Sequence, residues 1–240
     1  MTTSLDDTIE QLVIANHILA DQGVVDAFGH VSVRHPERPD RFFLSRSMAP
    51  SRVGREDIVE HDDGGAPIGA NGRAAYVERF IHAEMYRSRE DVMAIVHSHS
   101  PSVIPFSVSS VGLRPVYHMS SFLSRVARFE IREHFGRETD LLIRDAEKGR
   151  HLARALGDAN VVLLRGHGSV AVGRDLREAV FRAFYLEVNA RIQSQALALG
   201  GEIEFLTDEE AHAATEANAS QTARPWDLWA DEARARRAVR

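Results

Sequence analysis

The stretch "VMAIVHSHSP" at residues 92–101 organises the fold, because an apolar run there ends in two histidines, His97 and His99. A short apolar run of this kind predicts a buried β-strand. Successive side chains of a strand point to opposite faces, so positions 97 and 99 project from the same face and direct two imidazole rings toward one point. Neutral imidazole is a common ligand of zinc-like metals, and the pair therefore predicts part of a metal site that needs further ligands.

The other elements are predicted from apolar periodicity and turn residues. Before this strand the patterns indicate a helix at 5–23 capped by Ser4 and stopped at Gly23, strands at 30–35 and 41–46, a loop at 60–72 and a helix at 75–88. After it they indicate a short helix from Pro101, a strand at 114–119, a helix at 146–157, a hairpin of 160–166 with 168–173, a long helix at 175–200 and a polar tail. The alternation favours a layered α/β domain spanning residues 1–240.

Composition excludes several kinds of site and partner. The 240 residues include no cysteine, so a metal must be held by histidine and carboxylate. A net charge of -6 argues against non-specific binding of nucleic acid. The chain starts with polar and acidic residues, and no run approaches the ~18 apolar residues of a membrane span. We therefore expect a cytoplasmic protein with no membrane partner.

Two further segments offer ligands for the predicted metal. His167 follows an apolar strand and lies between Gly166 and Gly168, which let the backbone turn tightly. Glu78 and His82 are four residues apart and share one face of the predicted helix, so Glu78 is a candidate ligand. Each feature also has a simpler interpretation, because a Gly-His-Gly is often only a turn and Glu78 with His82 is often a solvated pair. Their joint occurrence at element ends favours a functional site.

Five segments in order resemble the class II aldolase/adducin family: "GHVSVR" at 29–34, "ERFIH" at 78–82, "VMAIVHSHSP", "LLRGHGSVAVG" at 163–173 and "LREAVFRAFYLE" at 176–187. The resemblance implies a three-layer α/β/α domain around a largely antiparallel sheet. It also implies metal-ligand histidines at His97, His99 and His167. Glu78 matches an acid of the family that resembles a metal ligand in the free enzyme and a proton shuttle when substrate is bound. Three histidine ligands leave an open coordination position, which is typical of a catalytic metal site.

Departures from the sugar-phosphate aldolases of this family indicate a different substrate. His30 stands where those enzymes carry asparagine, and the expected hydroxyl-bearing residues near 46–49 and 76–77 are replaced. Arg46 instead suits a planar carboxylate bound by two hydrogen bonds, which predicts an acidic substrate. The alternative is that Arg46 ends a strand and pairs with a surface acid such as Asp57 or Glu60.

The decarboxylase subset of the family, which acts on hydroxylated aromatic, pyridine or muconic acids, is similar to this sequence in segments such as "FFLSRSMAP", "PVYHMSSFL" and "RPWDLW". In the fuculose-phosphate type of aldolase, a neighbouring subunit supplies a tyrosine as proton donor, and His118 takes that place here. The catalytic candidates are Glu78, His118 and His30. The predicted substrate contacts are Arg46, Ser47, Tyr117 and Trp226.

The resulting hypothesis is a carbon–carbon lyase, a decarboxylase that uses one divalent ion per subunit, whether zinc, manganese, cobalt or iron. An aldolase or epimerase acting on a non-phosphorylated hydroxy carbonyl compound is the first alternative, and a non-catalytic adducin-like binding module is the second. By resemblance we expect a closed homo-oligomer, a homotetramer, with the tail at about 205–240 packed on a neighbouring subunit.

Overall fold

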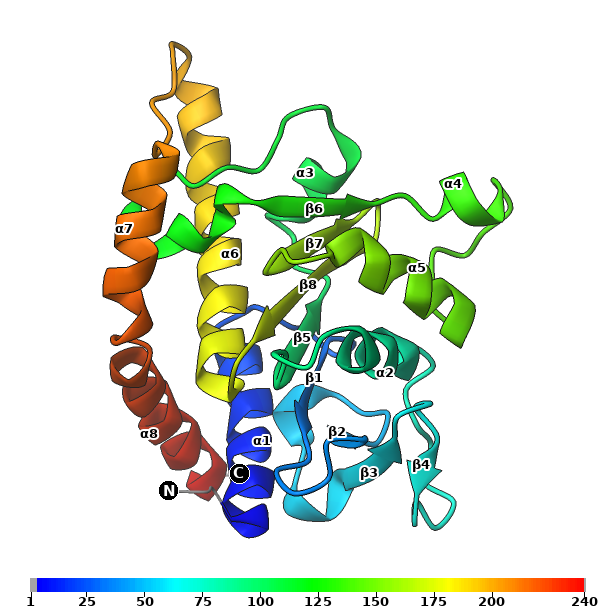
Figure 1. The fold of residues 1–240 in the computed structure, drawn as a ribbon. Coiled ribbons are helices and arrows are strands. Elements are labelled where there is room, and N and C mark those ends of the chain that lie inside the picture. Colours follow the sequence, from blue (N-terminus) through cyan, green and yellow to red (C-terminus); the bar gives the residue numbers. More distant parts are fainter. Residues whose placement is uncertain (1–3, 240) are drawn as a thin grey trace.

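The computed structural model describes residues 4–239 and is built around one eight-stranded sheet (Figure 1). The strands are β1 (His30–Arg34), β2 (Arg41–Ser45), β3 (Ile58–Asp62), β4 (Pro67–Ile68), β5 (Ala94–Ser98), β6 (Val126–Phe129), β7 (Val161–Leu164) and β8 (Gly168–Gly173). Their order across the sheet is β4-β3-β2-β1-β5-β8-β7-β6. Every neighbouring pair is antiparallel except β6 and β7.

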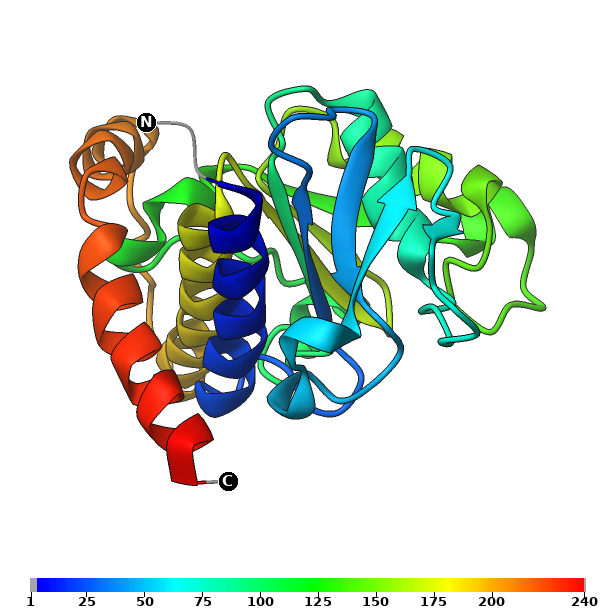
Figure 2. The same cartoon turned by 90° about the horizontal axis from the view of Figure 1, so that it is seen from below.

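Helices cover both faces of the sheet, as the view from below shows (Figure 2). The helices are α1 (Leu5–Asp21), α2 (Arg79–Ser88), α3 (Ile104–Val108), α4 (Arg132–Phe135), α5 (Ala146–Leu156), α6 (Leu176–Leu199), α7 (Asp208–Ala219) and α8 (Ala223–Val239), with short 3₁₀ turns η1 (Pro50–Arg52), η2 (Arg55–Asp57) and η3 (His118–Ser124). The three-layer α/β/α architecture with a largely antiparallel sheet is confirmed.

Two separate apolar cores lie on the two faces of the sheet, and the alternation of strand side chains divides residues between them. In β5, Ala94 and Val96 join the core under α1, α6 and α8, whereas Ile95 joins the core under α2 and α5. His97 follows the parity of Ile95. It therefore projects from the face that α2 covers.

Two predicted segments differ in detail. Residues 60–72 are not wholly a loop, because β3 extends to Asp62 and pairs with the short β4. The helix predicted at 75–88 begins at Arg79, and Glu78 is its N-cap. The longest helix, α6, and the β7–β8 hairpin lie where the sequence predicts them.

The strand predicted at 114–119 is wrong. Its backbone is hydrogen-bonded to side chains of α6 instead of a neighbouring strand: Asn189 Oδ1 accepts from the Val116 N–H at 3.0 Å, and Gln193 Oε1 accepts from the Arg114 N–H at 3.0 Å. Pro115, between them, has no N–H to donate to a ladder. The chain therefore runs beside α6 and enters η3 at His118.

The tail forms helices within the described residues. α7 packs on η3, and α8 packs on α1 and α6 of the same chain. Trp226 and Trp229 of α8 are buried in the core under these helices. Contact of the tail with a neighbouring subunit stays a prediction. Between residues 4 and 239, no helix combines the length and the apolar character needed to cross a lipid bilayer.

Candidate metal and substrate site

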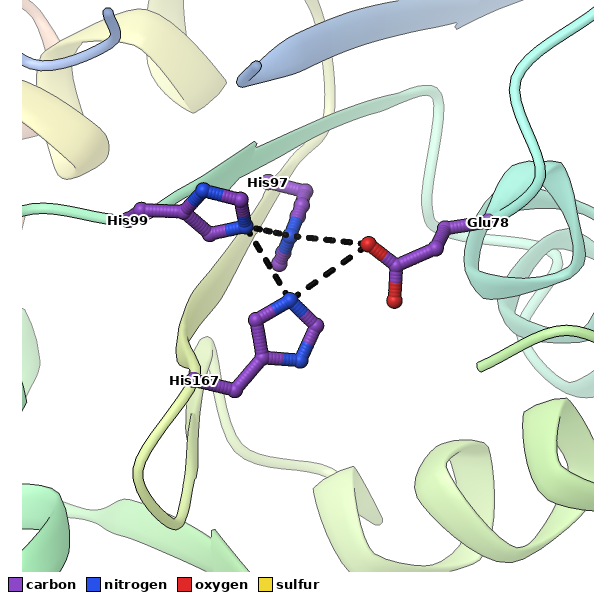
Figure 3. Close-up of side chains that lie close together, drawn as sticks. All are labelled: Glu78, His97, His99 and His167. Atoms are coloured by element: carbon purple, nitrogen blue, oxygen red, sulfur yellow. Dashed lines mark hydrogen bonds and ion pairs between the residues drawn. The ribbon is translucent and has the colours of Figure 1, made fainter. Parts of the chain in front are cut away.

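Three histidines and one glutamate from separate parts of the chain converge at the end of β5 (Figure 3). His97 lies in β5, His99 follows that strand, His167 lies in the turn between β7 and β8, and Glu78 caps α2. The antiparallel pairing of β5 with β8, in which Ser98 lies opposite Ser169, carries the His167 turn to His99. The order of β5, β8 and β7 in the sheet thus assembles the histidines.

Glycine at position 168 permits this approach. A Cβ atom there would lie 2.1 Å from the carbonyl oxygen of Ser98, a separation that no side chain tolerates. Gly166, on the other side of His167, has a φ of 65°, in the left-handed region that favours glycine. The sequence Gly-His-Gly is therefore a turn, and it is also the turn that brings His167 to the other two histidines.

The ligand atoms face one another at short range. Nε2 of His99 lies 3.1 Å from Nε2 of His97 and 3.0 Å from Nε2 of His167. Oε2 of Glu78 lies 3.7 Å from Nε2 of His97 and 3.4 Å from Nε2 of His167. All four ligand atoms lie within 4.8 Å of one another.

The hydrogen bonding of His97 fits a cation among these atoms. Nδ1 of His97 lies 3.1 Å from the carbonyl oxygen of Ser169, which can only accept, so Nδ1 carries the hydrogen of the ring. Burial lowers the pKa of His97 well below its ordinary value, so the ring is neutral and its Nε2 presents a lone pair. That lone pair faces a carboxylate oxygen of Glu78, an arrangement that a cation between them would stabilise.

The spacing of the nitrogen atoms also suits a metal ion. Zinc–nitrogen bonds of about 2.0–2.1 Å in tetrahedral geometry place ligand nitrogens about 3.3–3.4 Å apart. The observed separations of 3.0 and 3.1 Å are a few tenths of an ångström shorter. Small movements of the three rings would therefore accommodate such an ion.

Glu78 is buried and held as a carboxylate. Burial alone would raise its pKa, but the hydrogen bonds from His167 and from the backbone N–H of Ile143 outweigh that effect and hold the pKa well below its ordinary value. The backbone N–H of Ile143 donates to its Oε1 at 2.9 Å, which leaves Oε2 toward the histidines. Residue 78 is thus oriented by a loop that no sequence pattern connects to it.

A cavity of about 400 Å³ opens beside His99 and Glu78. Most of the side chains that line it are apolar, and none is a lysine or an arginine. The lining residues are Ala27, Phe28, His30, Ser47, Met48, Ala49, Tyr76, Val77, Glu78, His99 and Leu142. Phe28 is 68% exposed and Val77 is 50% exposed. These two side chains give the cavity an apolar rim.

The structure places His30 and Ser47 in the lining of this cavity, and their roles in catalysis and substrate binding stay predictions. His30 is buried in β1, and its ring centroid lies 4.9 Å from that of His97. The simpler interpretation placed His82 in solvent beside Glu78, but His82 is fully buried. Nε2 of His82 lies 2.7 Å from Nδ1 of His30. The interpretation of Glu78 and His82 as a solvated pair is therefore wrong, because both side chains are buried.

The other predicted contacts are not among the residues that line the cavity. Arg46 pairs with Asp57 at 2.6 Å, which is the alternative raised for it, and its side chain is 39% exposed. Trp226 is buried in the core beneath α8. Tyr117 and His118 lie at the start of η3, with His118 exposed. The roles of these four residues in binding or catalysis stay predictions.

Several residues of the site were missed by sequence reasoning. Tyr76 lines the cavity, and Ser32 and Tyr86 lie in a buried hydrogen-bonded group with His82. The signals were present in the sequence: His30 and Ser32 are two apart in a strand, and His82 and Tyr86 are four apart in a helix. Leu142 and Ile143 carry no comparable signal, because a loop places them.

Known proteins resemble this chain over most of its length. Residues 10–194 match the class II aldolase and adducin N-terminal domain. The chain is 39% identical over 241 residues to "Decarboxylase tropJ" of Talaromyces stipitatus, with 90% of each chain covered. It is 29% identical over 212 residues to the 3,4-dihydroxyphthalate decarboxylase of Arthrobacter keyseri, covering 84% of this chain and 83% of the relative. The crystal structure of an aldolase II superfamily protein from Pseudomonas syringae shares the fold, with a TM-score of 0.80, 23% identity and coverage of 97% and 94%.

Proposed function

This chain belongs to the class II aldolase and adducin family and is a carbon–carbon lyase, and we propose that it is a divalent-metal-dependent decarboxylase of a hydroxylated aromatic or related unsaturated carboxylic acid. The observation that carries this proposal is the convergence of His97, His99, His167 and Glu78 beside a mostly apolar cavity. Two relatives named as decarboxylases, each matching more than four-fifths of this chain, support the reaction class.

The lining of the cavity supports a planar apolar substrate body. Phe28, Met48 and Leu142 offer contact surfaces for an aromatic or conjugated ring. A sugar phosphate would bring a charged phosphoryl group to a lining that contains no lysine or arginine. The carboxylate and hydroxyl oxygens of the proposed acid would instead be held at the metal end, among the histidines.

The histidines and Glu78 would hold the ion, and the ion would act as a Lewis acid that stabilises negative charge on a substrate oxygen. Loss of carbon dioxide leaves an electron pair on carbon, which must then accept a proton. Glu78, a carboxylate before substrate binds, would take the proton of the substrate hydroxyl at Oε2, the oxygen that Ile143 leaves free, and would return it to that carbon. The apolar rim of Phe28 and Val77 would keep water from the reacting carbon.

His118 and Tyr117 enter the proposal through a neighbouring subunit. His118 is exposed at the first position of η3, where Nδ2 of Asn218 donates to its carbonyl oxygen at 2.7 Å. We propose a closed homotetramer in which this exposed histidine reaches the cavity of an adjacent copy. An exposed side chain on an anchored backbone suits such a contact.

An aldolase or epimerase would use the same ligands, so the reaction must be tested directly. Metal-loaded protein should be incubated with hydroxylated aromatic acids, including 3,4-dihydroxyphthalate, and in parallel with non-phosphorylated hydroxy aldehydes. The proposal predicts carbon dioxide with loss of one carboxyl group, identified by mass spectrometry. Cleavage of the hydroxy aldehydes, with no decarboxylation of any acid, would favour the aldolase. Failure to retain metal would favour a binding module.

A further inference from the structure

A chain of four buried polar side chains runs inward from the cavity. Nδ1 of His30 lies 2.7 Å from Nε2 of His82, and Nδ1 of His82 lies 2.6 Å from Oγ of Ser32. Oγ of Ser32 in turn lies 2.7 Å from the hydroxyl oxygen of Tyr86. All four residues are at most 5% exposed, and they come from β1 and α2.

The direction of every hydrogen bond in this chain follows from its inner end. The Tyr86 hydroxyl has one hydrogen, and Oγ of Ser32 is its sole hydrogen-bond partner among residues 4–239. If Tyr86 donates to Ser32, Ser32 must donate to Nδ1 of His82, because no other acceptor in that range contacts it. His82 then carries its hydrogen on Nε2 and donates to Nδ1 of His30.

The reverse direction leaves a group unsatisfied. His30 would donate through Nδ1, His82 would donate through Nδ1, and Ser32 would donate to Tyr86. The hydrogen of the Tyr86 hydroxyl would then be buried with no acceptor within the described part of the chain, which costs free energy. The first direction gives every hydrogen of Tyr86, Ser32 and His82 in this chain an acceptor, and leaves without one only the hydrogen on Nε2 of His30, which lines the cavity. It is therefore the more stable direction.

Both imidazole rings are neutral, so each has a single tautomer to fix. Each ring accepts a hydrogen bond at Nδ1, and a protonated imidazole has no ring nitrogen that can accept. A neutral ring that accepts at Nδ1 carries its hydrogen on Nε2. His30 lines the cavity, and its Nε2 makes no hydrogen bond to any residue that the structure describes.

We propose that Tyr86, acting through Ser32 and His82, holds His30 in the Nε2–H tautomer, so that His30 presents a hydrogen-bond donor to an anionic oxygen of the substrate. His30 is then the residue that contacts substrate, and the other three are positioning residues. His30 would recognise a substrate oxygen that accepts a hydrogen bond, such as an oxygen of a carboxylate or of an ionised hydroxyl group. The contact with substrate rests on the proposed function, whereas the tautomer does not.

The tautomer can be measured without turnover by nitrogen-15 NMR. Protein labelled with ¹⁵N-histidine should be studied by long-range proton–nitrogen correlation, with His30→Gln and His82→Gln used to assign the two rings. We expect both rings to be protonated at Nε2. His61 is the internal reference for the opposite state, because its Nδ1 lies 3.1 Å from the carbonyl oxygen of Val59 and must donate to it. Protonation of His30 at Nδ1 would overturn the proposal.

The influence of Tyr86 is tested by Tyr86→Phe, which removes only the hydroxyl, and by Ser32→Ala, which breaks the chain one step closer. Each should raise the Nδ1–H fraction of His30 and lower decarboxylase turnover several-fold. Tyr185→Phe, on α6, is the matched control and should change neither. An unchanged His30 tautomer in both test variants would show that Tyr86 does not position it. If the wild-type protein shows no decarboxylase activity but the His30 tautomer changes in these variants, the hydrogen-bonded chain from Tyr86 to His30 is supported and only the proposed reaction is refuted.

Discussion

The backbone N–H of Ile143 donates a 2.9 Å hydrogen bond to Oε1 of Glu78, and Oε2 of the same carboxylate faces the histidine cluster. A main-chain donor thus fixes the orientation of the carboxylate while leaving one oxygen for a metal ion or a proton. Because Glu78 is also the N-cap of α2, its backbone position is set by the helix. The two roles assigned to this residue, ligand and proton carrier, depend on that geometry.

Glu78→Gln should separate the two roles. The amide oxygen can still accept from Ile143, and three histidine ligands remain, so appreciable metal should be retained. An amide cannot carry a proton at neutral pH, so turnover should fall by about 10²–10⁴-fold. Metal content by elemental analysis and turnover should be measured on the same preparation. Wild-type turnover in this variant would remove Glu78 from the mechanism.

Replacement of His97, His99 or His167 by alanine should abolish both metal content and turnover, because only two histidine ligands then remain beside Glu78. Elemental analysis of the purified proteins provides the measurement. His212→Ala is the matched control, since His212 is an exposed residue of α7, and it should keep the wild-type metal content. Full metal occupancy in all three ligand variants would refute the metal site.

Arg46→Ala should have a small effect on turnover, because Arg46 pairs with Asp57 and is not among the residues lining the cavity. We expect kcat/KM to change by less than about twofold. The free energy of unfolding should fall by about 1–3 kcal/mol, because the buried carboxylate of Asp57 would lose its charged partner. A loss of about 2–4 kcal/mol in transition-state stabilisation, from kcat/KM on the acid, would instead show that Arg46 binds the substrate carboxylate.

The predicted oligomer can be tested with two inactive variants. Light scattering during size-exclusion chromatography should give a closed homotetramer. If the site combines the metal ligands of one copy with His118 of the next, His97→Ala and His118→Ala should each be inactive alone. Co-expressed mixtures of the two should regain part of the activity, because some interfaces contain both intact halves. An active monomer would contradict the shared site.

The parts of the molecule that sequence predicts well are those governed by local periodicity. His97 and the β7–β8 hairpin follow from strand alternation and from glycine at the turn, and the long α6 follows from its helical pattern. The wrongly predicted strand at 114–119 has strand-like residues whose hydrogen bonds go to α6 side chains instead. These hydrogen bonds depend on a helix some 70 residues later in the sequence, so the strand propensity of residues 114–119 alone does not predict them.

The site also combines features that follow from local sequence patterns with features that depend on distant residues. The three histidines of the cluster lie at predicted element ends, whereas Glu78 is predicted inside a helix. The orientation of its carboxylate depends on a contact between distant segments, that of Ile143 with Glu78. The ion pair of Arg46 with Asp57 illustrates the difficulty, since a guanidinium at a strand end suits a substrate or a neighbouring acid equally well. The folded arrangement shows the ion pair with Asp57, and the role of Arg46 in substrate binding stays a prediction.

The most direct test of the central claim is the metal dependence of carbon dioxide release from a hydroxylated aromatic acid. Carboxyl-¹³C-labelled 3,4-dihydroxyphthalate should be supplied to the purified protein, to protein stripped by a chelator, and to stripped protein restored with zinc, manganese, cobalt or iron. Labelled carbon dioxide should appear with the purified protein, disappear on stripping and return with at least one of these ions, in one-to-one ratio with the decarboxylated product. Equal release from stripped and restored protein would contradict the account.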